Sequence, residues 1–281
     1  MTKPNRVSLT QRGSAKPTPD DLERTAAKTR TLEQVSADYE LRSVQCLVES
    51  QANERLNSDE DLLDRITAVV KEGSDARTSI RLGWMTCGYR VDQNITPRLF
   101  ELGRLLTRVL RLPHPLDLFV EPESKMNACC LASRKGNRLV MCLNAGLVSS
   151  LTSQELLFIM GHEAGHAILK HGSVPKVSFD DPRFSPLEVI RLRALSRAQE
   201  LSCDRFGLLA CQDIRVASTA LFKVASGLAE KWISFDETAY AAHFDDLSSM
   251  AEVIPLEHAS ETHPLPPLRV KALIAFSSSS T

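Results

Sequence analysis

The sequence contains no long run of apolar residues. No segment approaches the roughly 18 consecutive apolar residues that a membrane-spanning helix needs. The first 30 residues carry basic side chains but lack the apolar core of a secretory signal. The sequence therefore predicts no integral membrane segment and no secretory leader.

Dense blocks of basic residues are also missing. The chain has 34 Lys and Arg against 35 Asp and Glu, with a net charge of -1. Proteins that bind nucleic acid or anionic membrane surfaces usually display a basic patch. The even charge balance therefore argues against a nucleic-acid partner.

Paired cysteines are missing as well. The seven cysteines are an odd number, and none of them forms a CxxC pair. In a chain of 281 residues this usage indicates reduced thiols rather than a disulfide framework. Together with the missing leader, it predicts a cytoplasmic location.

What remains is a chain with enough apolar residues for a core and with clear composition boundaries. Hydrophobic residues make up 43% of it, which suffices for one substantial core or two small ones. We expect a disordered polar tail (1–30), a helical N-terminal region (31–92), a main folded domain (93–276) and a flexible end (277–281).

Periodicity predicts a mostly helical α+β fold. Apolar residues at helical spacing mark residues 60–72 up to Gly73, and Thr96 followed by Pro97 opens another helix. Residues 78–91, "TSIRLGWMTCGYRV", are β-like but ambiguous. The stretch after Gly146 is helical almost to the end of the chain.

A small antiparallel sheet is expected before this last helical part. Residues 116–121, "LDLFVE", form a short strand. Residues 126–144 contain two apolar runs joined by 134–137, which is the pattern of a hairpin. The expected fold is therefore α+β, with this sheet preceding the main helix.

The motif HEAGH lies in a well-delimited helix. Thr152 and Glu155 form a capping box, and Gly172 supplies a stop, which predicts one helix over 153–171. His162 and His166 are one turn apart on one face, so both imidazoles can reach one metal ion. Glu163 follows His162 directly and can reach a metal-bound water without being a ligand.

The motif also has an alternative interpretation, a polar stripe on an ordinary surface helix. Gly165 favours function, because a glycine inside a helix costs about 1 kcal/mol relative to alanine and is tolerated where something approaches the backbone closely.

The following helix offers a third metal ligand. Ser185, Pro186 and Glu188 predict its start, and it should extend to about Cys211. Glu200 and Asp204 are one turn apart within it. Taken alone, they also fit a solvated helix face. Beside HEAGH, they fit a zinc ligand and an acceptor for the second N–H of a ligand histidine.

Three ordered motifs resemble those of one known family. HEAGH, then "ELSCD", then "THPLPPLRV" is similar to the gluzincin group of metallopeptidase family forty-eight, which includes the heat-shock protease HtpX and the type 1 CAAX prenyl protease. The resemblance covers about residues 95 to 275. Cys203 stands where the family usually has Ala. The well-known members are often embedded in membranes, so we expect a soluble member and no prenylated substrate.

The resemblance implies that residues 93–276 form a zinc metallopeptidase domain with a zincin-like fold. It further implies a zinc-dependent metalloendopeptidase with one zinc ion per chain. His162, His166 and Glu200 would hold the zinc, and Glu163 would be the general base. His263 would stabilise the tetrahedral intermediate. Arg269 would orient the late motif or pair with an acidic neighbour.

The expected partner is an unfolded or extended polypeptide. Asn127 and Ala128 resemble the family's N-A pair before the active helix. The strand 138–143, with Val140, is a candidate edge on which the substrate adds as an extra strand. In the alternative interpretation Leu139, Met141 and Leu143 simply pack on the helices, and both can hold because alternate residues face opposite ways.

Two further residues are assigned plain roles. His171 is five residues after His166, about 140° around a continuous helix, so it is expected to be a cap or surface residue. Cys203 is one turn from the metal, where a thiol can bind zinc or sense oxidation. The simpler interpretation, a small apolar filler, is preferred.

Competing hypotheses remain at this point. A zinc-binding regulatory or chaperone-like protein of the same fold would keep the metal but not cleave, which leaves Glu163 without a purpose. A helical interaction protein without zinc would make the motifs coincidental. Within the peptidase hypothesis, residues 31–90 could cover the cleft and hold the enzyme latent.

Overall fold

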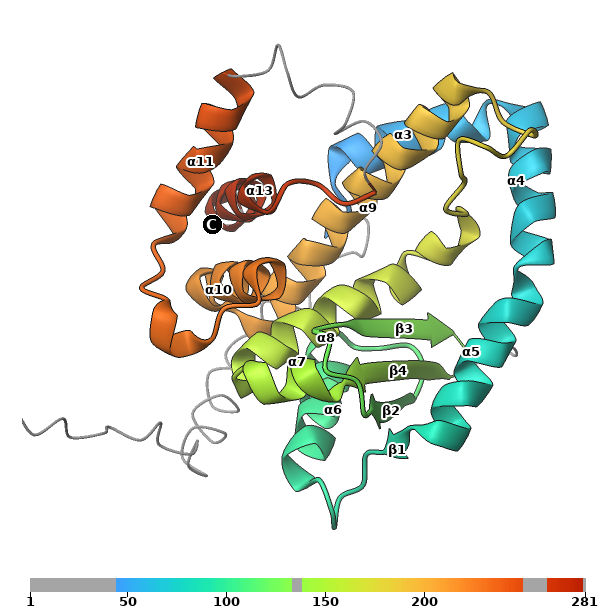
Figure 1. The fold of residues 1–281 in the computed structure, drawn as a ribbon. Coiled ribbons are helices and arrows are strands. Elements are labelled where there is room, and N and C mark those ends of the chain that lie inside the picture. Colours follow the sequence, from blue (N-terminus) through green and yellow to red (C-terminus); the bar gives the residue numbers. More distant parts are fainter. Residues whose placement is uncertain (1–43, 133–137, 250–261, 280–281) are drawn as a thin grey trace, which may run out of the picture.

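The computed structural model describes residues 44–132, 138–249 and 262–279, and its elements are numbered as in Figure 1. The predicted disordered tail (1–30) and the predicted turn (134–137) lie outside these residues. The strands are β1 (Tyr89–Arg90), β2 (Leu116–Glu121), β3 (Ala128–Ala132) and β4 (Leu139–Asn144). The helices are α3 (Leu47–Asn57), α4 (Glu60–Glu72), α5 (Ser74–Cys87), α6 (Pro97–Val109), α7 (Ala145–Ser150), α8 (Ser153–Ile168), α9 (Pro186–Cys211), α10 (Ile214–Ser226), α11 (Glu237–Ser249) and α13 (Pro266–Ser279), with 3-10 turns η1 (His171–Ser173) and η2 (Glu230–Trp232).

The fold is mostly helical with one small sheet, as the sequence predicts, but the sheet is mixed rather than antiparallel. Its strand order is β1-β2-β4-β3. β3 and β4 pair antiparallel, as a hairpin should, whereas β2 pairs with β4 in parallel. After β2 the chain forms β3 at the edge of the sheet, with one strand position left between the two. β4 then fills that position, antiparallel to β3 and therefore parallel to β2.

This strand order corrects one prediction about the substrate edge. β4 is paired on both sides, so it is not an edge strand and cannot accept a further strand. Val140 also lies under α5, in a buried cluster with Trp84 and Phe119. Its neighbours Leu139 and Met141 face the main core instead, as expected for alternate residues. Among the described strands, β3 is the edge beside α8.

The β-like prediction for residues 78–91 is wrong for most of its length. These residues belong to α5 up to Cys87, and only Tyr89 and Arg90 add a short strand to β2. The tertiary contact explains the difference, since a helix here places Trp84 on the outer face of the sheet. At the other end of the chain, α13 continues through Ser279, so it includes part of the segment predicted as a tail.

The start of α8 agrees with its predicted capping box, whereas its end does not agree with the prediction. Thr152 caps the helix, and the carboxylate of Glu155 accepts from the Thr152 amide. Buried Lys223 of α10 contacts the same carboxylate and compensates its charge. The α-helix ends at Ile168, and Lys170 adopts a left-handed conformation with φ of 57°. His171 therefore lies in η1 and not on α8.

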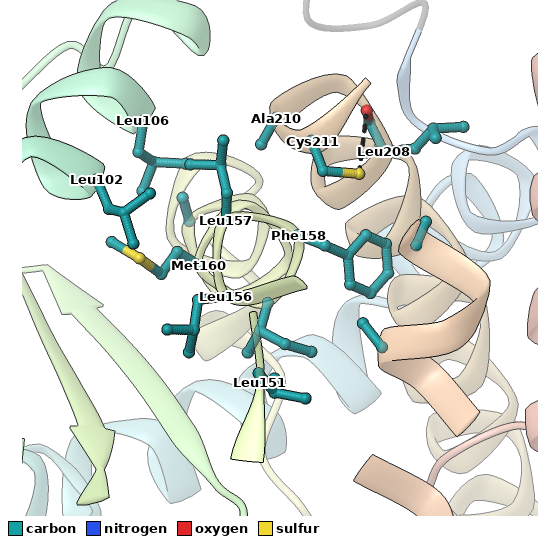
Figure 2. Packing of buried hydrophobic residues seen from close by; sticks show 14 of the residues in the cluster. Leu102, Leu106, Leu151, Leu156, Leu157, Phe158, Met160, Leu208, Ala210 and Cys211 are labelled. Carbon is teal, nitrogen blue, oxygen red and sulfur yellow. Dashed lines mark hydrogen bonds between the residues drawn. The ribbon is translucent and has the colours of Figure 1, made fainter. Parts of the chain in front are cut away.

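α8 packs very closely on α9, and glycines allow this approach. A Cβ atom on Gly161 would lie 2.6 Å from Ala210 Cβ and 2.9 Å from the Phe206 carbonyl oxygen. A Cβ on Gly207 would lie 2.7 Å from the ring of Phe158, which points toward α9 in Figure 2. On the opposite side, α8 contacts leucines of α6 (Figure 2). α8 is thus the central helix of the core (Figure 1).

Gly165 belongs to the same contact, which accounts for its position in the motif. Its Cβ would lie 3.0 Å from the Phe206 ring and 3.2 Å from the Cys203 Cα. Contacts at this distance require the neighbour to shift. The glycine suspected from the sequence is therefore needed for helix packing beside the site.

We predict that Gly161→Ala destabilises the protein. Alanine should favour a helix by about 1 kcal/mol. Overpacking against the α9 backbone should outweigh this gain, because forcing extra methyl groups into a packed core costs about 1–3 kcal/mol. Urea unfolding measures the net change. Gly83→Ala is the matched control, because nothing lies within 4 Å of its added Cβ in helix α5. Equal stabilisation of both variants would contradict the packing argument.

Candidate metal centre

Three side chains converge where α8 crosses α9. The Nε2 atoms of His162 and His166 are 3.2 Å apart. The Glu200 carboxylate lies 3.3 Å from His162 Nε2 and 3.5 Å from His166 Nε2. His162 and Glu200 are buried, and His166 is partly buried. The structure thus brings together the three residues that the sequence predicts as ligands.

These distances fit a tetrahedral metal ion. Ligand atoms about 2.0–2.1 Å from a tetrahedral Zn²⁺ lie about 3.3 Å from one another. Two imidazole nitrogens and one carboxylate oxygen are also ligand types that zinc accepts in catalytic sites, where a fourth position stays open. The residues present therefore fit the ion that the motif implies.

The ring of His162 is oriented from behind by Asp204. His162 Nδ1 lies 2.9 Å from Asp204 Oδ1, and Asp204 is almost fully buried. An ionised carboxylate at Nδ1 keeps the proton there and leaves Nε2 free to bind a metal. This geometry agrees with the role predicted for Asp204.

Arg269 pairs with this carboxylate. Its Nε and Nη2 atoms donate to the two oxygens of Asp204 at 2.8 Å and 2.6 Å. Burial would raise the pKa of Asp204, but the charge of Arg269 and its hydrogen bonds lower it below its usual value. Of the two roles predicted for Arg269, the structure therefore favours pairing with an acidic neighbour.

The pKa values of the two converging histidines are shifted in opposite directions. Burial lowers the pKa of His162, but hydrogen bonds to Asp204 and Glu200 outweigh it and raise that pKa to about 10. Burial and the nearby His162 charge lower the pKa of His166 to about 3. Burial would raise the pKa of Glu200, yet its hydrogen bond to His162 lowers it. The carboxylates thus require one positive charge at this point, which a proton or a metal cation can supply.

Glu163 lies next to these donors but is turned toward the sheet. The Cys130 backbone on β3 is near enough to its carboxyl group to oppose part of the rise in its pKa. Burial raises the pKa of Glu163 to about 7, although the charge of His162 opposes this shift. A carboxyl group with a pKa near neutrality can both accept and release a proton under ordinary conditions.

His263 reaches the centre from the segment before α13. Its Nε2 atom lies 3.6 Å from Glu200 Oε1, and its side chain is 55% exposed. Its Nδ1 atom is 3.0 Å from the Thr262 hydroxyl. Burial lowers the pKa of His263, so the neutral imidazole is favoured. The structure thus places His263 at the open side of the centre.

The substrate residues predicted from the N-A pair flank the edge strand. Asn127 is exposed, and its carbonyl oxygen accepts from the Asn144 amide at 3.0 Å. Ala128 is the first residue of β3 and pairs with Leu143. Both lie at the start of the strand whose Cys130 contacts Glu163, in contrast to buried Val140.

The surface role predicted for His171 is wrong. Its side chain is buried, and its Nδ1 atom lies 3.0 Å from Nδ1 of His166. The prediction assumed a continuous helix, but the left-handed residue Lys170 turns the chain so that His171 returns toward α8. Cys203 is fully buried, with its sulfur 3.4 Å from His171 Nδ1, and burial raises its thiol pKa well above the usual value.

His162, His166 and Glu200 each offer one ligand atom, and these atoms lie close enough together to hold a metal ion. The chain belongs to peptidase family M48, whose family model matches residues 96–179 and 181–276. The zincin-like fold predicted for it is the one that this family implies.

A curated relative supports this assignment. Plastoglobule-localized metallopeptidase 48, chloroplastic, of Arabidopsis thaliana is 31% identical over 205 residues. The match covers 65% of this chain but only 58% of that protein. No solved structure matches the chain. Among the described residues, no helix is long and apolar enough to cross a membrane.

We predict that His162→Ala and Glu200→Ala each abolish metal binding. Each change removes one of three converging donors, and two remaining ligands should not retain the ion through gel filtration. Elemental analysis of purified protein measures the metal content. His243→Ala, which removes an exposed histidine of α11, should keep one ion per chain. Full metal content in both site variants would contradict the ligand assignment.

Proposed function

We propose that the protein is a zinc-dependent metalloendopeptidase that cleaves extended or unfolded polypeptides. His162, His166 and Glu200 would hold one Zn²⁺ per chain, and Glu163 would act as the general base. The observation that carries this proposal is the position of Glu163. Its carboxyl group is close enough to His162, Glu200 and the Cys130 backbone of the edge strand β3 for all three to shift its pKa, which supports a position between the proposed metal donors and the proposed substrate strand.

The proposed mechanism assigns the proton transfers to Glu163. Bound zinc would supply a Lewis acid that lowers the pKa of a water molecule to about 7. The Glu163 carboxylate would accept a proton from the water that attacks the peptide carbonyl. It would then donate that proton to the leaving amine as the C–N bond breaks. A single group can serve both steps because its pKa of about 7 makes either form accessible near neutral pH.

The substrate would bind along β3. Only β3 and β1 are at the edges of the described sheet, and β3 is the one that contacts α8. An extended peptide can add there as a further strand, beginning near Asn127 and Ala128. Main-chain hydrogen bonds of this kind give affinity with little sequence preference, which favours unfolded or extended chains. The cytoplasmic location expected from the sequence stays a prediction.

His263 would stabilise negative charge on the reacting carbonyl oxygen. The Thr262 hydroxyl can donate to its Nδ1 atom, which leaves the ring proton on Nε2. Nε2 is the atom that faces Glu200 at the metal donors. A neutral imidazole in this orientation is a hydrogen-bond donor aimed at the position where charge develops.

We predict that Glu163→Gln keeps its zinc and its fold but loses casein cleavage. The amide has the size of the carboxyl group but cannot accept the proton from water. Zinc content, circular dichroism and casein hydrolysis are measured on the same preparation. Glu101→Gln, an exposed position of α6, is the control and should cleave normally. Cleavage by Glu163→Gln at the wild-type rate would refute the general-base role. A wild type that binds zinc but never cleaves would favour the regulatory alternative.

His263→Phe should lower kcat by about 10²-fold or more, with zinc retained and KM little changed. The reason is that an oxyanion donor contacts charge that exists mainly in the transition state. Steady-state kinetics on a fluorogenic peptide, together with metal analysis, measures all three quantities. Loss of zinc would place His263 among the metal ligands. A normal kcat would make it an ordinary loop residue.

A further inference from the structure

A line of buried polar side chains leads away from His166, on the side opposite to the metal donors. His166 Nδ1 lies 3.0 Å from His171 Nδ1. His171 Nε2 lies 3.0 Å from Glu49 Oε1. Glu49 is 0% exposed and His171 is 7% exposed. The line therefore runs from the metal centre through η1 to helix α3.

The three residues come from separate parts of the chain and meet by packing. α3 lies along α9 (Figure 1). It is joined to α9 where the Cys46 amide donates to the Ser202 hydroxyl at 2.9 Å. This contact places Glu49, one turn into α3, beneath η1. The 3-10 turn then presents His171 between Glu49 and His166.

Metal coordination would determine the direction of every hydrogen bond in this line. A His166 that binds through Nε2 must carry its proton on Nδ1, because a neutral imidazole has one donor and one acceptor nitrogen. The acceptor nearest to that proton is His171 Nδ1, 3.0 Å from His166 Nδ1, and the Cys203 sulfur also contacts His171 Nδ1, at 3.4 Å. The proton of His171 then resides on Nε2, where the Glu49 carboxylate accepts it.

We propose that Glu49 and His171 are positioning residues that fix the ring and tautomer of His166 for zinc binding. This inference rests on the ligand set proposed above. It makes the two ligand histidines alike, since each is supported from behind by a buried carboxylate. Asp204 supports His162 directly, and Glu49 supports His166 through His171.

Burial of Glu49 argues against a purely structural role. Moving a carboxylate out of water costs several kcal/mol. An apolar side chain would cover the same surface of α9 without that cost. The carboxylate offers what leucine does not, an acceptor for the His171 N–H. Buried charges that are retained at such a cost are candidates for functional positions.

The inference also gives helix α3 a new role. Glu49 lies outside the residues matched by the family model, which begin at 96. α3 would therefore complete the metal centre instead of only covering it. A truncation of residues 1–90 removes Glu49 as well as any cover, so lower activity after truncation would not by itself argue against latency.

A second metal ion is the competing explanation for this cluster. The donor atoms of His166, His171 and Cys203 also lie close enough together to hold a metal. The two Nδ1 atoms are 3.0 Å apart, which is the length of an N–H···N hydrogen bond, and Glu49 accepts on the far side of His171. We therefore favour the hydrogen-bonded line. Two zinc ions per chain would overturn it.

Zinc affinity, measured by competition with a chelator on the full chain, tests the proposal. Glu49→Leu and His171→Phe should each weaken binding by about 10- to 100-fold. Glu49→Gln keeps an acceptor oxygen for the His171 N–H, so its zinc affinity should be close to that of the wild type and higher than that of Glu49→Leu. Glu54→Leu, which removes an exposed carboxylate from the same helix, is the matched control and should bind as the wild type does. Unchanged affinity in both Glu49→Leu and His171→Phe would refute the proposal.

A comparison of melting temperatures separates positioning from general stability. In the positioning role, the rise in Tm on adding zinc should shrink in Glu49→Leu, because ligand stabilisation depends on affinity. A structural role would lower Tm of metal-free and zinc-loaded protein equally. The zinc affinity of the double variant Glu49→Leu, His171→Phe should lie within about two- to threefold of that of His171→Phe alone, because Glu49 acts on His166 only through His171. An additive loss would mean that Glu49 acts independently of His171.

Histidine ¹⁵N–¹H spectra of the zinc-loaded wild type keep the proposal testable even if a variant does not fold. The ring proton of His166 should be on Nδ1 and that of His171 on Nε2. A His171 proton on Nδ1 would overturn the inference. Failure of the underlying function looks different, because a wild type that binds no zinc, or a His162→Ala variant that binds it normally, would refute the ligand set itself.

Discussion

The close contact between α8 and α9 is the constraint on which the metal centre depends. The two histidines belong to α8 and the glutamate to α9, and their donor atoms are 3.2–3.5 Å apart. Such spacing leaves little tolerance in the distance between the helices. Gly161 and Gly207 remove the side chains that would otherwise separate the two backbones. The same glycines thus determine both how the core packs and whether three ligands can reach one ion.

A second constraint is the balance of charge around that ion. Glu163, Glu200 and Asp204 crowd a buried volume in which Arg269 supplies one permanent positive charge. The remaining negative charge accounts for the strongly raised pKa of His162. A cation at the Nε2 atoms would take over the role of that proton. The ligands are therefore arranged in advance for a positive charge, which reduces the reorganisation that metal binding requires.

Local signals in the sequence were sufficient for much of this architecture. Capping boxes predict the starts of α8 and α9 because capping depends on residues within one turn. The one-turn spacing of His162 and His166 is likewise local. What failed depends on tertiary contacts. The central position of β4 depends on its pairing with both β2 and β3. The helical state of α5 depends on the packing of Trp84 against the sheet. No window of sequence contains these facts.

The role of His171 shows the same limit at one residue. Helical geometry excludes it as a neighbour of His166, and only the left-handed Lys170 brings it back. Glu49 is farther still, 113 positions before His162 in the numbering. It could not be predicted without knowing that α3 lies along α9. The proposed metal ligands, and Asp204 with them, follow sequence motifs, whereas the contacts of His171 and Glu49 follow from the packing.

The wide separation of these supports along the chain has a consequence for biosynthesis. Arg269, which pairs with Asp204, is synthesised after both Glu49 and the HEAGH helix. Because translation proceeds from the N-terminus, a nascent chain that stops short of α13 has the HEAGH helix but lacks the arginine that pairs with Asp204 behind His162. The proposed metal centre can therefore be completed only after α13 has been made, so the order of translation delays its assembly.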